Sequence, residues 1–159
     1  MKSRLKTLLQ FSIFWLLFFI LGKIIFTLLN YSSIENFSLI PSLQSLFYGL
    51  KLDISFLGYT LVIPFFLFLI DSLGPNRLYQ QIFKYYSYLL IFFFSLFIVV
   101  DAALYQHWGI KLDIEPLKYI NKPSLILGNL SYTTLIFQIS IWIILVIVSI
   151  FIFNKAKIE

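Results

Sequence analysis

Residues 85–105 read YYSYLLIFFFSLFIVVDAALY, and Asp101 is the one charged residue among them. The apolar side chains do not alternate with polar ones, which excludes a strand of a membrane β-barrel. At about 1.5 Å per residue, a helix of this length crosses the roughly 30 Å of hydrocarbon in a bilayer. In hydrocarbon, an isolated segment satisfies its backbone N–H and C=O groups only as a helix. This stretch therefore predicts a membrane-spanning α-helix.

Three further stretches meet the same test, at residues 7–29, 54–73 and 133–153. The predicted fold class is an all-α integral membrane protein with four transmembrane helices, at about 7–29, 54–73, 85–105 and 133–153. Residues 1–159 show no internal repeat or flexible linker, so we expect a single membrane domain. The first stretch exceeds the roughly 7 to 15 apolar residues of a cleaved signal peptide, which predicts an uncleaved anchor.

The composition of the whole chain agrees with a bilayer as its main solvent. The 159 residues are 60% hydrophobic and 12% charged, whereas a soluble domain is about half apolar and roughly a quarter charged. The 19 Phe, 10 Tyr and 3 Trp exclude a disordered chain, which has few aromatic residues. With no cysteine and one histidine, thiolate chemistry and zinc sites of the Cys/His type are excluded as well.

The formal net charge of +5 comes from basic residues at the borders of the apolar stretches. That placement favours anionic lipid headgroups as partners and gives no support to nucleic acid. With the N-terminus inside, the cytoplasmic set is Lys2, Arg4, Lys6, Arg77, Lys84, Lys155 and Lys157, and the outer set is Lys51, Lys111, Lys118 and Lys122. The excess of basic residues inside predicts that both termini lie in the cytoplasm.

The two outer segments each predict a short interfacial helix. In the first, Pro41 or Ser42 opens a stretch in which Leu43, Leu46, Phe47 and Leu50 recur at helical spacing. In the second, Leu125, Ile126 and Leu127 indicate a similar element. The predicted second span begins directly after the first of these helices.

The candidate site residues lie near the outer face on this topology: Lys51, Asp53, Asp101, His107, Lys111 and Asp113. A carboxylate at the centre of a span costs about 2.5–3.5 kcal/mol on insertion scales, so Asp101 needs a partner. Candidate partners are Lys23, Lys51 and Lys111. Lys23 lies within the first span, and we expect its ammonium to extend to the outer headgroups.

Two interpretations of this outer cluster remain open. In the first, the charged side chains form an interfacial salt-bridge network that ties the two outer segments together. In the second, Lys51 and Lys111 meet the phosphate of an anionic lipid, and the carboxylates hold those two cations in place. His107 alone indicates a hydrogen-bonded structural residue more than a base. No metal-loop spacing or catalytic motif occurs, so the sequence predicts no catalytic residue and no metal site.

Two stretches of the chain resemble a known family. Residues 48–55, YGLKLDIS, resemble the entry to the second span in membrane domains of the lipoteichoic acid synthase family. The segment from Asp101 through residues 105–113, YQHWGIKLD, to Tyr119 is similar to the segment that follows the third span in bacterial members. The family consists of sulfatase-like phosphoglycerol and phosphoethanolamine transferases of the alkaline-phosphatase superfamily.

The resemblance implies a membrane domain of five helices followed by a large extracytoplasmic catalytic domain, in the bacterial cytoplasmic membrane. The family's nucleophilic Thr and its divalent metal, Mn or Zn, belong to that catalytic domain. The present chain would then be a truncated member or a fragment, without a cofactor and inactive alone. Its expected partners are phosphatidylglycerol or phosphatidylethanolamine and a sulfatase-like domain encoded elsewhere, with Lys51, Asp53, His107, Lys111 and Asp113 facing that domain.

Two other functions remain possible on the residues alone. A small transport or channel protein needs polar groups at several depths, and Asp53, Asp71 and Asp101 are the candidates. A structural membrane subunit needs surfaces on which helices of a partner can pack. The GxxxG pattern that is typical of such surfaces does not occur in the spans. The expectation that the chain takes part in an enzyme therefore depends on the resemblance.

Overall fold

The computed structural model describes residues 2–31, 39–71, 77–109 and 132–156, and the regular structure within these ranges is helical. The helices are α1 (Lys2–Leu29), α2 (Leu39–Asp71), α3 (Arg77–Trp108) and α6 (Tyr132–Lys155). Each contains a stretch long and apolar enough to cross a membrane: Leu5–Leu29, Phe47–Asp71, Arg77–Gln106 and Tyr132–Lys155. The predicted all-α class with four transmembrane helices is therefore confirmed.

Two helices begin earlier than the predicted spans. α2 starts at Leu39, so the turns expected to form a separate surface helix are continuous with the second span. As a consequence, Asp53 lies in the interior of α2 and not at its start. α3 starts at Arg77, and its first two turns include the exposed Gln80 and Gln81 before the apolar stretch begins. The helix expected around residues 125–127 lies outside the described residues.

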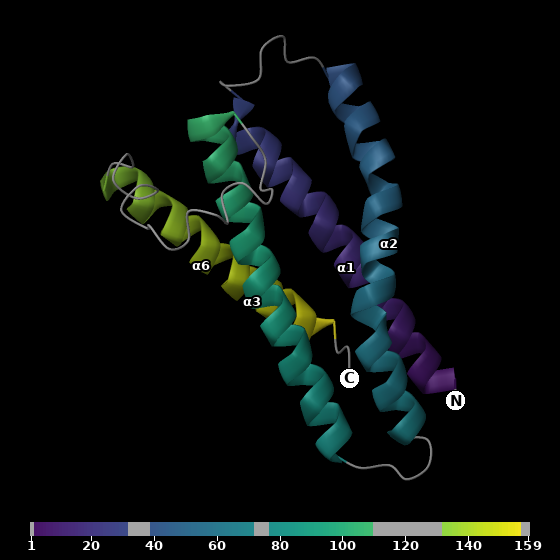
Figure 1. Ribbon diagram of the computed structural model, residues 1–159. Helices are drawn as coiled ribbons and strands as arrows, with labels where there is room; N and C mark the ends of the chain where they lie inside the picture. Colours follow the sequence, from purple (N-terminus) through teal and green to yellow (C-terminus); the bar gives the residue numbers. More distant parts are fainter. Residues whose placement is uncertain (1, 32–38, 72–76, 110–131, 157–159) are drawn as a thin grey trace.

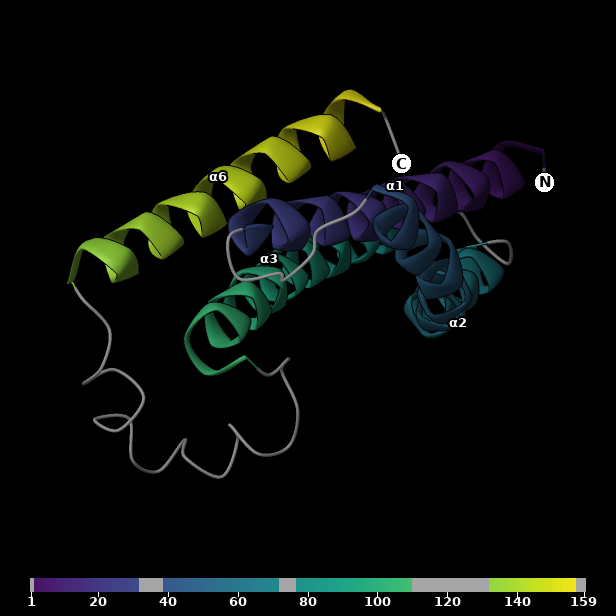
Figure 2. The same ribbon diagram turned by 90° about the horizontal axis from the view of Figure 1, so that it is seen from above.

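The four helices form a loose bundle in which α1 and α3 run in one direction and α2 and α6 run in the other (Figure 1). We call the end at which α1 and α3 begin the base of the bundle, and the opposite end the top. α1 packs against both α2 and α3, and α6 packs mainly against α3. Viewed from the top, α2 and α6 lie on different sides of the α1–α3 pair (Figure 2).

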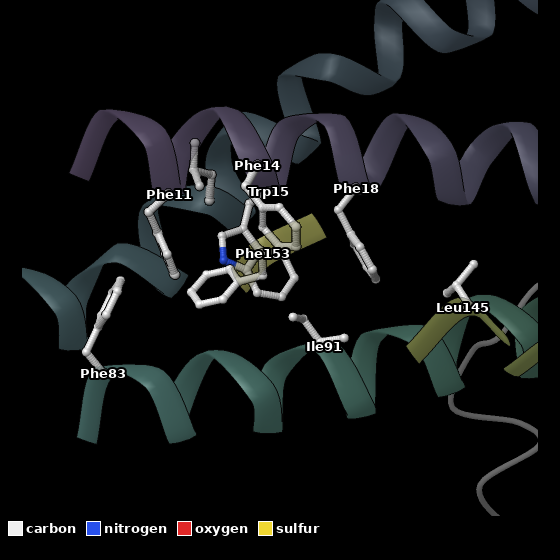
Figure 3. Close-up of a cluster of buried hydrophobic side chains, with 9 residues drawn as sticks. Phe11, Phe14, Trp15, Phe18, Phe83, Ile91, Leu145 and Phe153 are labelled. Atoms are coloured by element: carbon white, nitrogen blue, oxygen red, sulfur yellow. The ribbon is translucent and has the colours of Figure 1, made fainter. Parts of the chain in front are cut away.

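Aromatic side chains form the core between the helices. Phe11, Phe14, Trp15 and Phe18 of α1 are buried together with Phe83 and Ile91 of α3 and Phe153 of α6, as Figure 3 shows. The Trp15 and Phe94 rings meet edge to face, with their centroids 5.3 Å apart. Such pairs contribute about 0.5–1.5 kcal/mol each. Because lipid is as apolar as these side chains, close packing of rings holds the helices together where burial from water cannot.

A proline in α2 links that helix to α3. Pro64 is buried, lacks an N–H, and so leaves the carbonyl of Thr60, four residues earlier, without its helical donor. The Tyr86 hydroxyl of α3 donates a hydrogen bond to this carbonyl oxygen at 3.0 Å. In a membrane interior, where water is absent, such a substitute donor allows the helix to continue through proline.

Substitution of Tyr86 by Phe removes this donor and is expected to lower the free energy of unfolding by about 0.6 kcal/mol, the average for hydrogen bonds between membrane helices. In a Pro64→Ala background the Thr60 carbonyl regains a backbone donor, so the effect of Tyr86→Phe should become smaller. Unfolding in mixed micelles with increasing dodecyl sulfate measures both values. Tyr85→Phe, at an exposed neighbour, is the control. Equal effects of Tyr86→Phe in the two backgrounds would contradict the role assigned to this hydroxyl.

Candidate functional site

An ion pair between two helices is the central feature of the top half of the bundle. The Lys23 ammonium of α1 donates a hydrogen bond to Asp53 Oδ2 of α2 at 2.5 Å. The side chains are 29% and 11% exposed, respectively. Either charge alone at the middle of a span would cost about 2.5–3.5 kcal/mol. Pairing offsets much of that cost and holds α1 and α2 in one register.

A glycine gives the lysine its path to the carboxylate. Gly49 lies one helical turn before Asp53 on α2, and a Cβ atom at Gly49 would collide with the Nζ end of the Lys23 side chain. Residues four apart lie on the same face of a helix. Within the stretch Gly49-Leu50-Lys51-Leu52-Asp53, the first and last residues therefore face α1, whereas Lys51 and Leu52 are exposed.

Contacts between α1 and α3 show the depth of the ion pair. Gly22 lies against Ile98, and the rings of Phe26 and Tyr105 lie 5.2 Å apart. Lys23 is therefore level with the turn around Ile98, about 10 Å along α3 from Tyr105. If Tyr105 lies in the interface, as aromatic residues at span ends commonly do, the pair lies inside the hydrocarbon.

Asp101 lies at nearly the same height, between Ile98 and Tyr105 on α3, and is half-buried. α1, α2 and α3 thus each contribute an ionisable residue to one layer of the bundle. This layer lies in the top half of the bundle.

The structure changes two details of the expected charge pairing. Lys23 does not extend to the headgroups, because its ammonium is bound to Asp53. In the lipid-site interpretation, the carboxylate of Asp53 holds Lys51. In the structure, this carboxylate binds Lys23. Lys51 is exposed and has no ion-pair partner among the described residues.

The remaining predicted site residues are only partly placed. His107 lies in the last turns of α3, and its side chain is not among those described. Lys111 and Asp113 lie outside the described residues. Across the described part of the chain, no group of three or more His, Asp or Glu side chains converges as a metal site would require.

Sequence reasoning missed two residues near the top. Gly49 belongs to the stretch that carries the family resemblance. That its missing Cβ makes room for the Lys23 side chain follows only from the packing of α1 against α2. Asn30, fully buried at the end of α1, donates from Nδ2 to the Phe26 carbonyl at 3.0 Å. Its Oδ1 atom has no hydrogen-bond donor within the described ranges. An isolated Asn after an apolar stretch is a common helix end, so the sequence offered no signal of burial.

The fold and this site define a multi-pass, all-α membrane protein with an ion pair inside the bundle. Comparisons with protein-family models, with curated protein sequences and with solved structures return no match. The function proposed below is therefore inferred from the arrangement of charges in this chain.

Replacement of Asp53 by Asn leaves the Lys23 ammonium without its carboxylate, and we expect the free energy of unfolding to fall by about 3 kcal/mol. Exchanging the two residues, Lys23→Asp with Asp53→Lys, should restore much of the loss because the pair is remade in reverse. Lys51→Gln, at an exposed position on the same helix, should change stability by less than about 0.5 kcal/mol. Unfolding in mixed micelles measures all three proteins. A loss for Asp53→Asn no larger than that for Lys51→Gln would show that the pair is not stabilising.

Gly49→Val should displace the flexible end of the Lys23 side chain from Asp53 and lower stability by up to about 3 kcal/mol, the loss expected when a buried ion pair is broken. Gly58→Val on the same helix is a matched control, because a Cβ atom at Gly58 meets nothing within 4 Å. The two changes share the same intrinsic effect on helix formation, so their difference reports the contact with Lys23. Thermal aggregation of the detergent-solubilised proteins gives the ranking. Equal midpoint temperatures of aggregation for Gly49→Val and Gly58→Val would refute the close approach of Lys23 to Gly49.

Proposed function

We propose that this chain is the membrane-embedded, lipid-presenting part of a lipid-headgroup transferase of the lipoteichoic acid synthase type. It would act in the bacterial cytoplasmic membrane, with the base of the bundle in the cytoplasm and the top facing the cell envelope. The transfer step itself would belong to a sulfatase-like catalytic domain outside residues 1–159. The chain would hold an anionic or zwitterionic phospholipid, such as phosphatidylglycerol or phosphatidylethanolamine, beneath that domain.

The observation that carries the proposal is that residues 49–53 face two directions, with two residues toward α1 and the lysine between them exposed. Gly49 and Asp53 face α1 and fix Lys23, which leaves that pair neutral as a unit. Lys51, between them, is exposed on α2. A cation that is not neutralised by its neighbouring carboxylate attracts phosphate. The long Lys51 side chain can extend from the span to the interface, where a basic residue contributes about 1 kcal/mol to the binding of an anionic surface.

The distribution of basic residues supports the proposed orientation. Among the described helices, the base contains the positions of Lys2, Arg4, Lys6, Arg77, Lys84 and Lys155, against the carboxylate of Asp71. The described top contains Lys23, Lys51, Asp53 and Asp101, whose formal charges cancel. Basic residues near span ends are retained on the cytoplasmic side, so the base is the end that this rule places inside.

A transport function receives less support. Asp53 in the top half and Asp71 near the base would have to line one polar route. The aromatic core of Phe11, Trp15, Phe18 and Phe83 lies between these two levels and is closely packed. A closed apolar layer of this kind prevents passage of ions unless the helices separate.

The proposal predicts that Lys51→Ala weakens binding of phosphatidylglycerol about fivefold, equivalent to roughly 1 kcal/mol. Lys51→Ala with Lys111→Ala should weaken it further, because Lys111 follows the third span on the same side. Native mass spectrometry of the protein titrated with phosphatidylglycerol gives the affinities, and Lys51→Arg, which keeps the charge, is the matched control. Unchanged affinity in both alanine proteins would remove the lipid-presenting function from the top of the bundle.

A further inference from the structure

Two hydroxyl groups on α2 face outward from the bundle near the middle of the membrane. Tyr59 lies halfway along the membrane-spanning stretch Phe47–Asp71 and is 74% exposed, and Ser55, one helical turn before it, is also exposed. Neither hydroxyl has a hydrogen-bond partner among the described residues. The hydroxyls of Ser12 and Ser140, by contrast, each donate to a carbonyl of their own helix, at 2.9 and 2.8 Å. Ser55 and Tyr59 thus each place an unpartnered polar group on the lipid-facing surface.

The position of Tyr59 is unusual for a tyrosine in a membrane. Tyrosines are enriched at the two interfaces, where the hydroxyl reaches water. Tyr59 is about 18 Å along the helix from either end of its span, which is farther than its side chain extends. Tyr86 of α3, at nearly the same level, has its hydroxyl bonded to the Thr60 carbonyl of a neighbouring helix. A hydroxyl without a hydrogen bond is costly in hydrocarbon, so we expect an equivalent partner for Tyr59 on a helix outside this bundle.

Ser55 and Tyr59 belong to a continuous exposed surface along α2. The buried residues of α2, among them Asp53, Leu57 and Thr60, lie on the opposite side of the helix. The exposed residues recur at alternating spacings of four and three, and we call them the outer face of α2: Tyr48, Leu52, Ser55, Tyr59, Val62, Phe66 and Leu69. This spacing keeps two helices in contact over several turns at a crossing angle of about 20°. α2 lies at the edge of the bundle, where a second helix can approach it (Figure 2).

The outer face of α2 is complementary to itself. Two copies of one membrane protein insert in the same orientation, so a two-fold axis along the membrane normal brings equal residues to equal depth and forms each contact twice. A tyrosine side chain in a helix points toward the preceding turn, which brings the Tyr59 hydroxyl to the level of Ser55 of the partner subunit. The small serine leaves room for the bulky tyrosine ring, and each hydroxyl can both donate and accept. A second copy of this chain therefore supplies the missing partner of both hydroxyls.

We propose that two copies of this chain dimerise through the outer face of α2, with Tyr59 of each copy donating a hydrogen bond to Ser55 Oγ of the partner subunit. Lys51 lies beside this face, one turn above Ser55, and its long side chain carries the ammonium to the interface. The contact is centred below Lys51, so the dimer does not depend on the proposed lipid-presenting function.

The test measures dimerisation of the whole chain in phosphatidylcholine vesicles by energy transfer between copies labelled at Gln80→Cys, an exposed position in a chain without cysteine. Tyr59→Phe removes both symmetric hydrogen bonds and should raise the dissociation constant about ninefold, a factor of about three for each bond. Ser55→Ala should have a similar effect, and the two changes together should be no worse than either alone, because they remove the same bonds. Tyr85→Phe and Ser140→Ala, at exposed positions of α3 and α6, are the matched controls and should leave the constant unchanged.

Cysteine crosslinking in single-cysteine proteins locates the contact. Phe65 and Phe66 are adjacent and similarly exposed, at 54% and 58%, but only Phe66 lies on the outer face. Under oxidation in vesicles, Phe66→Cys should form disulfide-linked dimers several times faster than Phe65→Cys. Absence of energy transfer at high protein-to-lipid ratio would show a monomer and overturn the proposal. A dimer that Tyr59→Phe and Ser55→Ala leave intact, or equal crosslinking at the two positions, would place the contact on another surface and overturn it as well.

Discussion

Every polar group inside a bilayer must find its partner within the protein, and the contacts between these helices follow from that requirement. The carbonyl that Pro64 leaves unsatisfied accepts a hydrogen bond from Tyr86, which ties α2 to α3. The ammonium of Lys23 is bound by Asp53, which ties α1 to α2. In both cases a costly group has its partner on a neighbouring helix, and the same contact that lowers its cost fixes the packing.

The aromatic core and the polar contacts have different roles in this bundle. Rings such as Trp15 and Phe94 fill the space between helices and supply contact energy through edge-to-face pairs. The ion pair and the tyrosine hydrogen bond are directional, so they select one register among the many that a set of Phe, Leu and Ile faces would allow. At Gly22 and Gly49 the absence of a Cβ leaves room for the side chains of Ile98 and Lys23 from neighbouring helices.

The two polar layers lie at opposite ends of the bundle. The upper layer contains the Lys23–Asp53 ion pair and the exposed Lys51, whereas the described part of the base has more basic than acidic residues. Among the described residues, the base has more lysines and arginines than the top, and this is the kind of difference that the positive-inside rule uses.

The sequence alone determined the class of this protein, because uninterrupted apolar stretches such as residues 85–105 have one stable backbone arrangement in lipid. It also indicated that charged residues collect near the top, since Asp53 and Asp101 lie toward the same ends of antiparallel spans. It did not determine which charges pair. The partner of Lys23 depends on how α1 and α2 are rotated about their axes, and helices that are apolar on all sides do not specify that rotation. The tertiary structure determines this partner. The missing Cβ at Gly49 leaves room for the Lys23 side chain, which extends from α1 to Asp53 on α2.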